Sequence, residues 1–298
     1  MARRPIVALT FLVALAAGCF GTEAPPAPRE IRPDGWNGAR LAVGYVGHAT
    51  ILLDLGGTYV LTDPALFDRV GVALGPVTVG PRRTVAPALP LARIPPLAAV
   101  VITHAHFDSL DLRSLRALPK DATLVGPPRC RDLLGDLGFR RYVELGWGER
   151  TTAGDVTIEA IPVNHWGRRY PWGAWRGYNG YVFEKDGLRV LFASDTAFTR
   201  DFARLRDGGA PPILAILGNG AYDPWIRNHA DPEQVWQMFV DSGARWLAPV
   251  HWDTFRLGRE PLGDAMRRLV AAAGPDADRI VFHAIGDEWT LPDTGGTP

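Results

Sequence analysis

The sequence has few cysteines, no excess charge and no long apolar run. Two of its 298 residues are cysteine, Cys19 and Cys130, which are too few for a disulfide framework. Basic and acidic residues number 32 each, so the chain lacks the positive surface that binds nucleic acid, and we expect no nucleic-acid partner. The apolar run near the start, residues 6–17, is too short to cross a bilayer as a helix.

The first 35 residues have the composition of an export signal followed by a tether. Arg3 and Arg4 precede the apolar run, which is typical of a secretory signal peptide. The run ends in Leu15-Ala16-Ala17-Gly18-Cys19, which resembles the lipobox of bacterial lipoproteins, although that pattern prefers leucine where Ala16 stands. We therefore predict a lipoprotein signal peptide over residues 1–18, a lipidated Cys19, and a flexible proline-rich tether over residues 19–35. The protein would then be an exported bacterial lipoprotein, membrane-anchored on the periplasmic or extracellular side. An ordinary cleaved signal peptide is the alternative.

Residues 36–298 contain no second linker and no repeat, and we expect them to form one domain. Short apolar runs rich in β-branched residues predict strands. These runs are Leu41–Val46, Ile51–Leu55, Tyr59–Thr62, Ala98–Thr103, Val156–Ile161, Gly180–Glu184, Arg189–Ala193, Ile213–Leu217 and Trp246–Val250.

Two helices are also indicated. One begins after Asp231, because Asp231 and Gln234 stand at the two positions of a capping box around Pro232. The other carries Leu262, Met266, Leu269 and Val270 on one face. Hairpins followed by alternating strands and helices indicate a layered α/β or α+β domain.

Candidate ligands follow the ends of four predicted strands. The run Ala98–Thr103 leads directly into His104, His106 and Asp108. Alternate residues of an extended segment point to the same side, so His104 and His106 can share one metal ion. Three later strands end at His165, Asp195 and His251 in turn. Imidazole together with carboxylate suits zinc and similar metals, so the sequence predicts a metal site at these strand ends.

These residues resemble a known family. His104–Asp108 is similar to the H-x-H-x-D-H signature of the metallo-β-lactamase superfamily, and His165, Asp195 and His251 follow in the order of its remaining ligands. Within the superfamily, the chain is similar to the branch of N-acylphosphatidylethanolamine phospholipase D and L-ascorbate-6-phosphate lactonase. The segments that carry this likeness include Gly47-His48-Ala49-Thr50, Thr62-Asp63-Pro64, His165-Trp166-Gly167, Ser194-Asp195-Thr196, His229 ahead of Asp231-Pro232-Glu233, and His251-Trp252-Asp253-Thr254-Phe255.

The resemblance implies a four-layer αββα sandwich with metal, here zinc, at one edge of its two sheets. It implies that His104, His106 and His165 bind a first ion, that Asp195 bridges, and that Asp108 and His251 bind a second. Asp108 and Asp195 would also orient the attacking water and take its proton. His48 and His229 are further catalytic candidates, for protonating a leaving group or binding phosphate. For His48, a hydrogen bond that supports a ligand is the alternative.

The chain departs from the family signature at Ser109, where the superfamily has a metal-binding histidine. A serine hydroxyl is a poor zinc ligand beside imidazole, so the second site should be weakened. Three outcomes remain open. The protein holds a single metal ion, or it holds two with Asp111 or Asp253 as the replacement donor, or it is catalytically inactive.

The predicted function is metal-dependent hydrolysis of a phosphodiester or ester, with a phospholipid-like substrate favoured. The alternatives are a non-catalytic metal- or ligand-binding lipoprotein and a lactonase. Aromatic and arginine side chains over Trp166–Tyr181 suit a pocket for an acyl chain and a phosphate head, or alternatively pack beneath a long loop. We expect structural roles for Cys130, at the start of a predicted helix, and for His283.

Overall fold

The structure is a computed structural model that describes residues 23–75, 77–208 and 210–292. The predicted signal peptide and the predicted lipidation site at Cys19 lie outside these residues. Within them, no helix combines the length and the apolar character needed to cross a membrane.

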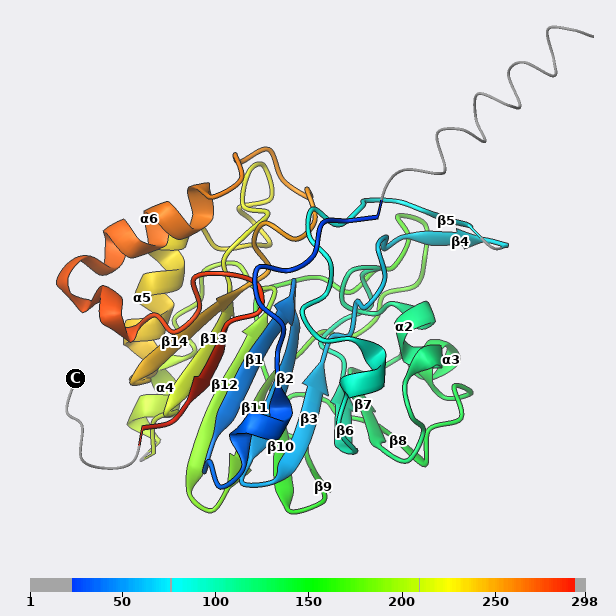
Figure 1. Cartoon of the computed structure of the whole chain (residues 1–298), viewed down its shortest axis with the longest axis horizontal. Coiled ribbons are helices and arrows are strands. Elements are labelled where there is room, and N and C mark those ends of the chain that lie inside the picture. The colour runs from blue at the N-terminus through cyan, green and yellow to red at the C-terminus, as the bar shows by residue number, and fades with distance from the viewer. Residues whose placement is uncertain (1–22, 76, 209, 293–298) are drawn as a thin grey trace, which may run out of the picture.

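Two sheets lie face to face in the centre of the molecule (Figure 1). The first has the strand order β15-β1-β2-β3-β6-β7-β8 and the second the order β14-β13-β12-β11-β10-β9. The strands of the first sheet are β1 Ala42–Gly47, β2 Thr50–Leu55, β3 Thr58–Thr62, β6 Leu97–Val101, β7 Thr123–Gly126, β8 Arg141–Glu144 and β15 Glu288–Thr290. Those of the second are β9 Arg150–Ala153, β10 Val156–Ile161, β11 Gly180–Lys185, β12 Leu188–Ser194, β13 Leu214–Gly218 and β14 Trp246–Val250. A separate hairpin pairs β4 Val72–Leu74 with β5 Val77–Val79.

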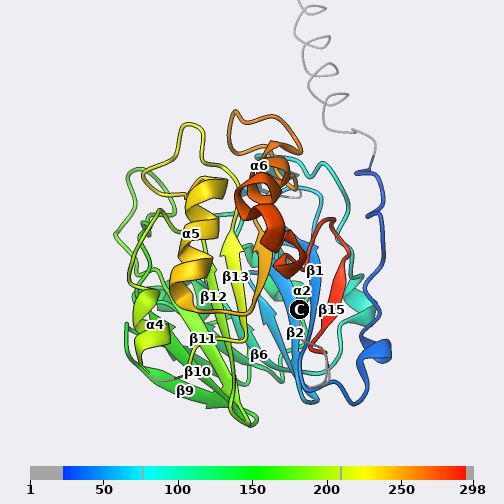
Figure 2. The same cartoon turned by 90° about the vertical axis from the view of Figure 1, so that its left-hand side faces the viewer.

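Helices cover the outer sides of the pair of sheets. α5 and α6 pack together, with α4 beside α5, over the second sheet (Figure 2). The short α2 and α3 lie on the other side of the molecule, beside the strands β6 to β8 (Figure 1). The bounds are α2 Leu112–Ala117, α3 Arg131–Leu134, α4 Ala203–Asp207, α5 Pro232–Ser242 and α6 Asp264–Ala273, with 3₁₀ turns η1 Pro33–Trp36, η2 Leu91–Arg93 and η3 Gly274–Arg279. The predicted four-layer αββα sandwich is confirmed.

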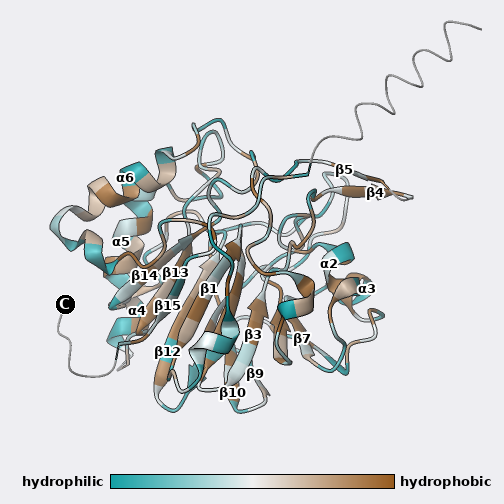
Figure 3. Ribbon diagram, in the orientation of Figure 1, coloured by the Kyte–Doolittle hydropathy of each residue, from teal (hydrophilic) through white to brown (hydrophobic). Residues whose placement is uncertain are grey.

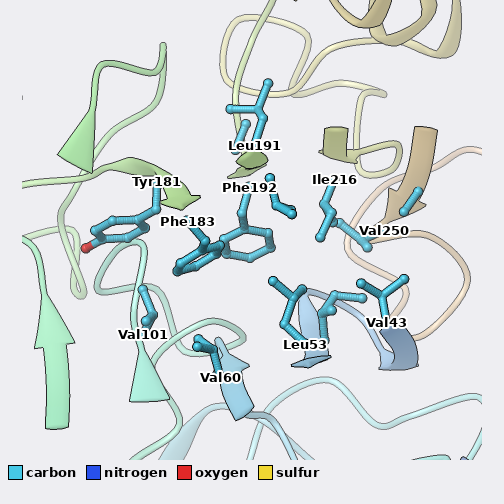
Figure 4. Packing of buried hydrophobic residues seen from close by; sticks show 14 of the residues in the cluster. Val43, Leu53, Val60, Val101, Tyr181, Phe183, Leu191, Phe192, Ile216 and Val250 are labelled. Carbon is cyan, nitrogen blue, oxygen red and sulfur yellow. The ribbon is translucent and has the colours of Figure 1, made fainter. Parts of the chain in front are cut away.

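The core fills the space between the sheets. Val43, Leu53 and Val60 of the first sheet face the rings of Phe183 and Phe192 of the second (Figure 4). Every residue of β1 and β2 is buried, because one face of these strands meets the other sheet and the opposite face is covered as well. Strands covered on both faces read as nearly continuous apolar runs, which is why they could be found in the sequence.

The nine predicted strands are present within one or two residues of their predicted bounds, and so are the two helices. The capping box at the start of α5 is formed: the Asp231 carboxylate accepts from the Gln234 backbone, and the Gln234 side chain accepts from the Asp231 backbone. Leu262 lies outside α6, and both Leu262 and Val270 are exposed, so neither belongs to the buried face of that helix. Cys130 precedes α3 and is buried, and burial raises the pKa of its thiol to about 12, in line with a structural role.

The last part of the predicted tether lies against the domain. The backbone carbonyl of Pro25 accepts a hydrogen bond from Ala86, and the amide of Ile31 donates to the carbonyl of Ala88. The Ile31 side chain is fully buried above Gly44, where a Cβ would come within 2.9 Å of the Ile31 Cγ2 atom. The segment is therefore attached to the domain by backbone hydrogen bonds at Pro25 and Ile31 and by the side chain of Ile31, which fills a space that the first sheet leaves open.

If Ile31 belongs to the core, Ile31→Ala should lower the free energy of unfolding by about 2–5 kcal/mol, because it leaves a cavity. Ile226→Ala is the matched control, since that side chain is 43% exposed and its loss should change stability by less than about 0.5 kcal/mol. Urea denaturation followed by circular dichroism measures both. Equal effects of the two substitutions would show that residues 25–35 do not contribute to the fold.

Candidate metal centre

The candidate ligands meet at one edge of the sandwich because their strands run in the same direction. β1 and β6 of the first sheet share one direction, since β1–β2 and β2–β3 are antiparallel and β3–β6 is parallel. In the second sheet, β10–β11 and β11–β12 are antiparallel, whereas β12–β13 and β13–β14 are parallel. β10, β12 and β14 therefore share a direction. The segments that follow these five strands carry His48, His104 to Asp108, His165, Asp195 and His251. Both sheets thus contribute ligands to a single site.

Four side chains form the first group. One ligand atom from each of His104, His106, His165 and Asp195 lies within 4.8 Å of the others. The facing nitrogens His106 Nδ1 and His165 Nε2 are 3.2 Å apart, and His104 Nε2 is 3.5 Å from an Asp195 oxygen. A tetrahedral zinc ion with Zn–N bonds of about 2.0–2.1 Å holds its ligand atoms roughly 3.3 Å apart. The spacing of the group therefore fits a metal ion of this size.

Several buried polar atoms of the described residues lack a well-aligned hydrogen bond. They include Nε2 of His104 and of His251 and both carboxylate oxygens of Asp195. Leaving buried polar atoms unpartnered is costly, especially for a charged carboxylate. A cation bound among these atoms would satisfy them together, so the donor set fits the metal that the sequence predicts.

The charges of the group also favour a cation. Burial, aided by the neighbouring imidazoles, lowers the pKa of His106 to about 4 and that of His104 well below its usual range, which leaves neutral rings with free lone pairs. Burial works against ionisation of Asp195, but His251 outweighs it and holds the carboxyl pKa well below its usual value. Burial likewise opposes a charge on His251, yet the carboxylates of Asp195 and Asp108 raise its pKa to about 10. The two carboxylates thus attract positive charge to this point.

A second group joins His48, Asp108 and His251. Nε2 of His48 is 2.9 Å from Asp108 Oδ2, and Nε2 of His251 is 3.4 Å from the same oxygen. His48 and His251 both have left-handed backbones, with φ of 60° and 67°, and the amide of His251 donates to the carbonyl of His48. The structure therefore brings His48 into the cluster, and its side chain is fully buried there.

His229 lies on the open side of the cluster. Its ring centroid is 5.2 Å from those of His165 and His251, and it forms a third group with Asp195 and His251. Burial lowers the pKa of His229 to about 3, so its ring is neutral at ordinary pH. His229 thus lies close to the Asp195 carboxylate and also lines the cavity beside the cluster.

Hydrogen bonds behind the ligands fix their orientation. Nδ1 of His165 donates to the carbonyl of Asn228, which leaves Nε2 free to face the cluster. Nδ1 of His104 contacts the Thr103 hydroxyl, which itself donates to the Asp63 carboxylate. Asp63 also accepts from Ser194, and burial raises its pKa to about 8. Sequence reasoning assigned Asp63 no role, although the Thr62-Asp63-Pro64 segment pointed to it.

Neither replacement donor considered for the second ion is available. Asp111 caps α2, accepting from the backbone of Arg113 and Ser114 and from the Ser114 hydroxyl. Asp253 accepts from the backbone of Gly263. Of the three outcomes left open, replacement of the missing histidine by Asp111 or Asp253 is not supported, because both carboxylates accept hydrogen bonds elsewhere and neither belongs to a described group of candidate ligands. Ser109 itself is fully buried.

A cavity of about 320 Å³ opens beside the cluster. His106, Asp108, Asp195 and His229 form its polar part. Its apolar part includes Val70, Pro81, Phe107, Trp166, Trp225 and Leu257. The cluster is thus accessible to a substrate whose other portion is apolar.

The segment Trp166–Tyr181 contributes less to this cavity than the sequence suggested. Trp166 lines it and packs against His106 at 4.5 Å between ring centroids. Arg169, however, donates to the carbonyls of Ala105 and Leu110, and Arg176 pairs with Asp132. These contacts fit the alternative that the segment packs beneath a long loop, because the two guanidinium groups hold the surrounding loops together. His283 is exposed at the surface, apart from the cluster, as expected.

Asp63→Asn should weaken metal binding about 10- to 100-fold, because it disturbs the hydrogen bonds that orient His104 through Thr103. Competition with a fluorescent chelator measures the dissociation constant. Asp155→Asn is the control, since Asp155 pairs with Lys185 at the surface and should leave metal affinity unchanged. An unaltered affinity in Asp63→Asn would mean that this hydrogen-bond chain does not support the ligand.

Comparison with known proteins places this site in a family. Residues 58–252 match the family described as Beta-lactamase superfamily domain. An uncharacterised protein of Mycobacterium tuberculosis is 35% identical over 252 residues, which cover 80% of this chain and 65% of that protein, so the chain spans about two thirds of that relative's length. N-acyl-phosphatidylethanolamine-hydrolyzing phospholipase D 1 of Caenorhabditis elegans is 28% identical over 272 residues, covering 84% of this chain and 75% of that protein.

A solved structure shares the fold. The isothiocyanate hydrolase from Delia radicum gut bacteria superposes with a TM-score of 0.67 at 20% identity, covering 84% of this chain and 98% of the other. The family match over residues 58–252 shows that the chain belongs to the β-lactamase superfamily, and the likeness to the Caenorhabditis elegans enzyme supports the branch that the sequence predicts.

Proposed function

We propose that this protein is a zinc-dependent phosphodiesterase of the phospholipase D type that acts on a phospholipid at a membrane surface, to which a lipidated Cys19 attaches it. The proposal rests on one observation, which is that a single cavity has both a polar and an apolar side. The metal-ligand cluster forms one side, and large apolar side chains form the other. A phospholipid offers the same combination of a charged phosphodiester and an apolar body.

Different residues of the cluster would carry out different steps of the hydrolysis. A bound zinc ion would lower the pKa of a water molecule to about 7 and offset the charge of the phosphoryl oxygens. Asp108 and Asp195, which both line the cavity, would orient this water and accept its proton as it attacks phosphorus. The bond from phosphorus to the leaving oxygen would then break, and the alkoxide would take up the proton that the carboxylate had accepted, which releases an alcohol and a phosphomonoester. The neutral ring of His229 would donate a hydrogen bond to a phosphoryl oxygen.

The surface beside the cavity supports a membrane location. The hairpin β4–β5 exposes Leu74, Val77 and Val79 to solvent, at 61%, 41% and 55% (Figure 3). The base of the same hairpin, at Val70 and Gly71, lines the cavity. Pro25, near the start of the described chain, bonds to Ala86, a few residues beyond the hairpin. An anchor at Cys19 would therefore hold the hairpin and the cavity near the bilayer.

The zinc-loaded protein should hydrolyse bis(p-nitrophenyl) phosphate and N-acylphosphatidylethanolamine, and His106→Ala should reduce both activities by at least about a thousand-fold, since it removes a ligand of the activated water. His283→Ala is the matched control, because that exposed histidine lies outside the cluster. Its activity should equal that of the wild type.

Other outcomes of this assay point to other functions. Bound metal without turnover of any ester, lactone or phosphodiester would favour a metal- or ligand-binding lipoprotein. Turnover confined to lactones would favour a lactonase. Full activity in metal-free protein would contradict the proposal altogether.

Replacing Leu74, Val77 and Val79 by serine should lower turnover of phospholipid in vesicles on the order of ten-fold or more, because each buried methylene contributes about 0.8 kcal/mol to membrane binding. Turnover of the soluble bis(p-nitrophenyl) phosphate should not change. Val240, Leu262 and Val270, exposed at 43%, 46% and 38% on or next to α5 and α6, provide a matched triple serine control. If both triple variants lost phospholipid turnover to the same extent, the hairpin would have no specific role at the membrane.

A further inference from the structure

We infer that His48 is a ligand of the second metal ion and supplies the imidazole that position 109 lacks. The signature of the superfamily ends in a histidine that binds this ion, and the chain has Ser109 there. The inference rests on the metal-dependent hydrolysis proposed above, but not on the identity of its substrate. It would give the second site two imidazoles and a carboxylate, from residues that come from both sheets.

The ligand atoms of the second site converge on one carboxylate oxygen. Asp108 Oδ2 lies 2.9 Å from Nε2 of His48 and 3.4 Å from Nε2 of His251. For bonds of about 2.0–2.2 Å, neighbouring ligand atoms of one ion are roughly 2.9–3.5 Å apart. The imidazole rings of His48 and His251 lie side by side, with centroids 4.0 Å apart. Two imidazoles and a carboxylate thus stand at the spacing of ligands that share an ion.

Asp195 links this group to the first. Its Oδ2 faces His104 at 3.5 Å, whereas its Oδ1 faces His251 at 3.1 Å. Each oxygen is thus turned toward a different set of imidazoles. An ion held by His48, Asp108 and His251 would therefore have Asp195 as the neighbouring carboxylate, through the contact of its Oδ1 atom with His251.

The backbone holds His48 in place for this role. The His48 amide donates to the Thr254 hydroxyl, and its carbonyl accepts from the amide of His251. The turn between β1 and β2 that carries His48 is therefore tied to the loop that follows β14. Two ligands from different sheets are kept at a fixed separation by a direct hydrogen bond between their main chains.

The remaining donors near the second site are less suited to it. His229 forms a group with Asp195 and His251, but Asp108 is not a member of that group, and His229 lines the cavity where substrate enters. Asp111 and Asp253 bond to backbone groups elsewhere. His48, by contrast, is fully buried and contacts the carboxylate directly.

The test is the zinc content of purified protein, measured by mass spectrometry without any substrate. The wild type should bind two zinc ions per chain and His48→Gln should bind one. Glutamine retains an N–H group that can donate to Asp108, so it separates a ligand from a hydrogen-bonding support. His283→Gln is the control and should keep two ions. The double variant His48→Ala/Ser109→His should regain the second ion, because it restores the family's donor.

A zinc-edge anomalous diffraction map of the wild type decides the point independently of any variant. If His48 is a ligand, an ion should lie about 2.0–2.1 Å from its Nε2 atom. One ion in the wild type, two ions in His48→Gln, or a second ion out of bonding distance from His48 would each overturn it. A wild type that binds no metal at all would instead overturn the proposed function.

Discussion

The site depends on carboxylates that are buried among imidazoles and need a cation. Asp195 is buried, and neither of its oxygens has a well-aligned hydrogen bond within the described chain. Burying such a charge is unfavourable unless positive charge lies nearby. The surrounding histidines can meet this need in part, and a metal ion meets it fully. A cation shared by Asp195 and Asp108 would bind loops that belong to two different sheets, which hydrogen bonds such as that between His251 and His48 already hold together.

Much of the fold and most of the site could be predicted from sequence, for one physical reason. His104, His165, Asp195 and His251 each follow a buried strand, and buried strands read as apolar runs that end abruptly at a polar residue. The αββα arrangement came from the resemblance to the superfamily and not from periodicity. The ligand positions and the fold were therefore predicted by different kinds of evidence, which the structure brings together.

The features that the sequence did not predict depend on side-chain direction or on weak local patterns. Asp111 and Asp253 looked like free carboxylates, but one caps a helix and the other bonds to a loop amide, and neither partner can be read from spacing alone. Ile31 lies in a proline-rich stretch that is typical of linkers, yet the absence of a side chain at Gly44 makes room for it. The strands Val72–Leu74 and Val77–Val79 are too short, and too exposed, to give an alternating pattern.

The left-handed backbones of His48 and His251 have a consequence for how this chain can change. A residue other than glycine in that conformation costs on the order of 1–3 kcal/mol. Glycine would relieve the strain at both places but could not contribute a nitrogen to the cluster. A chain optimised for stability alone would favour glycine at these two turns, so the imidazoles there exchange some stability for a place in the cluster.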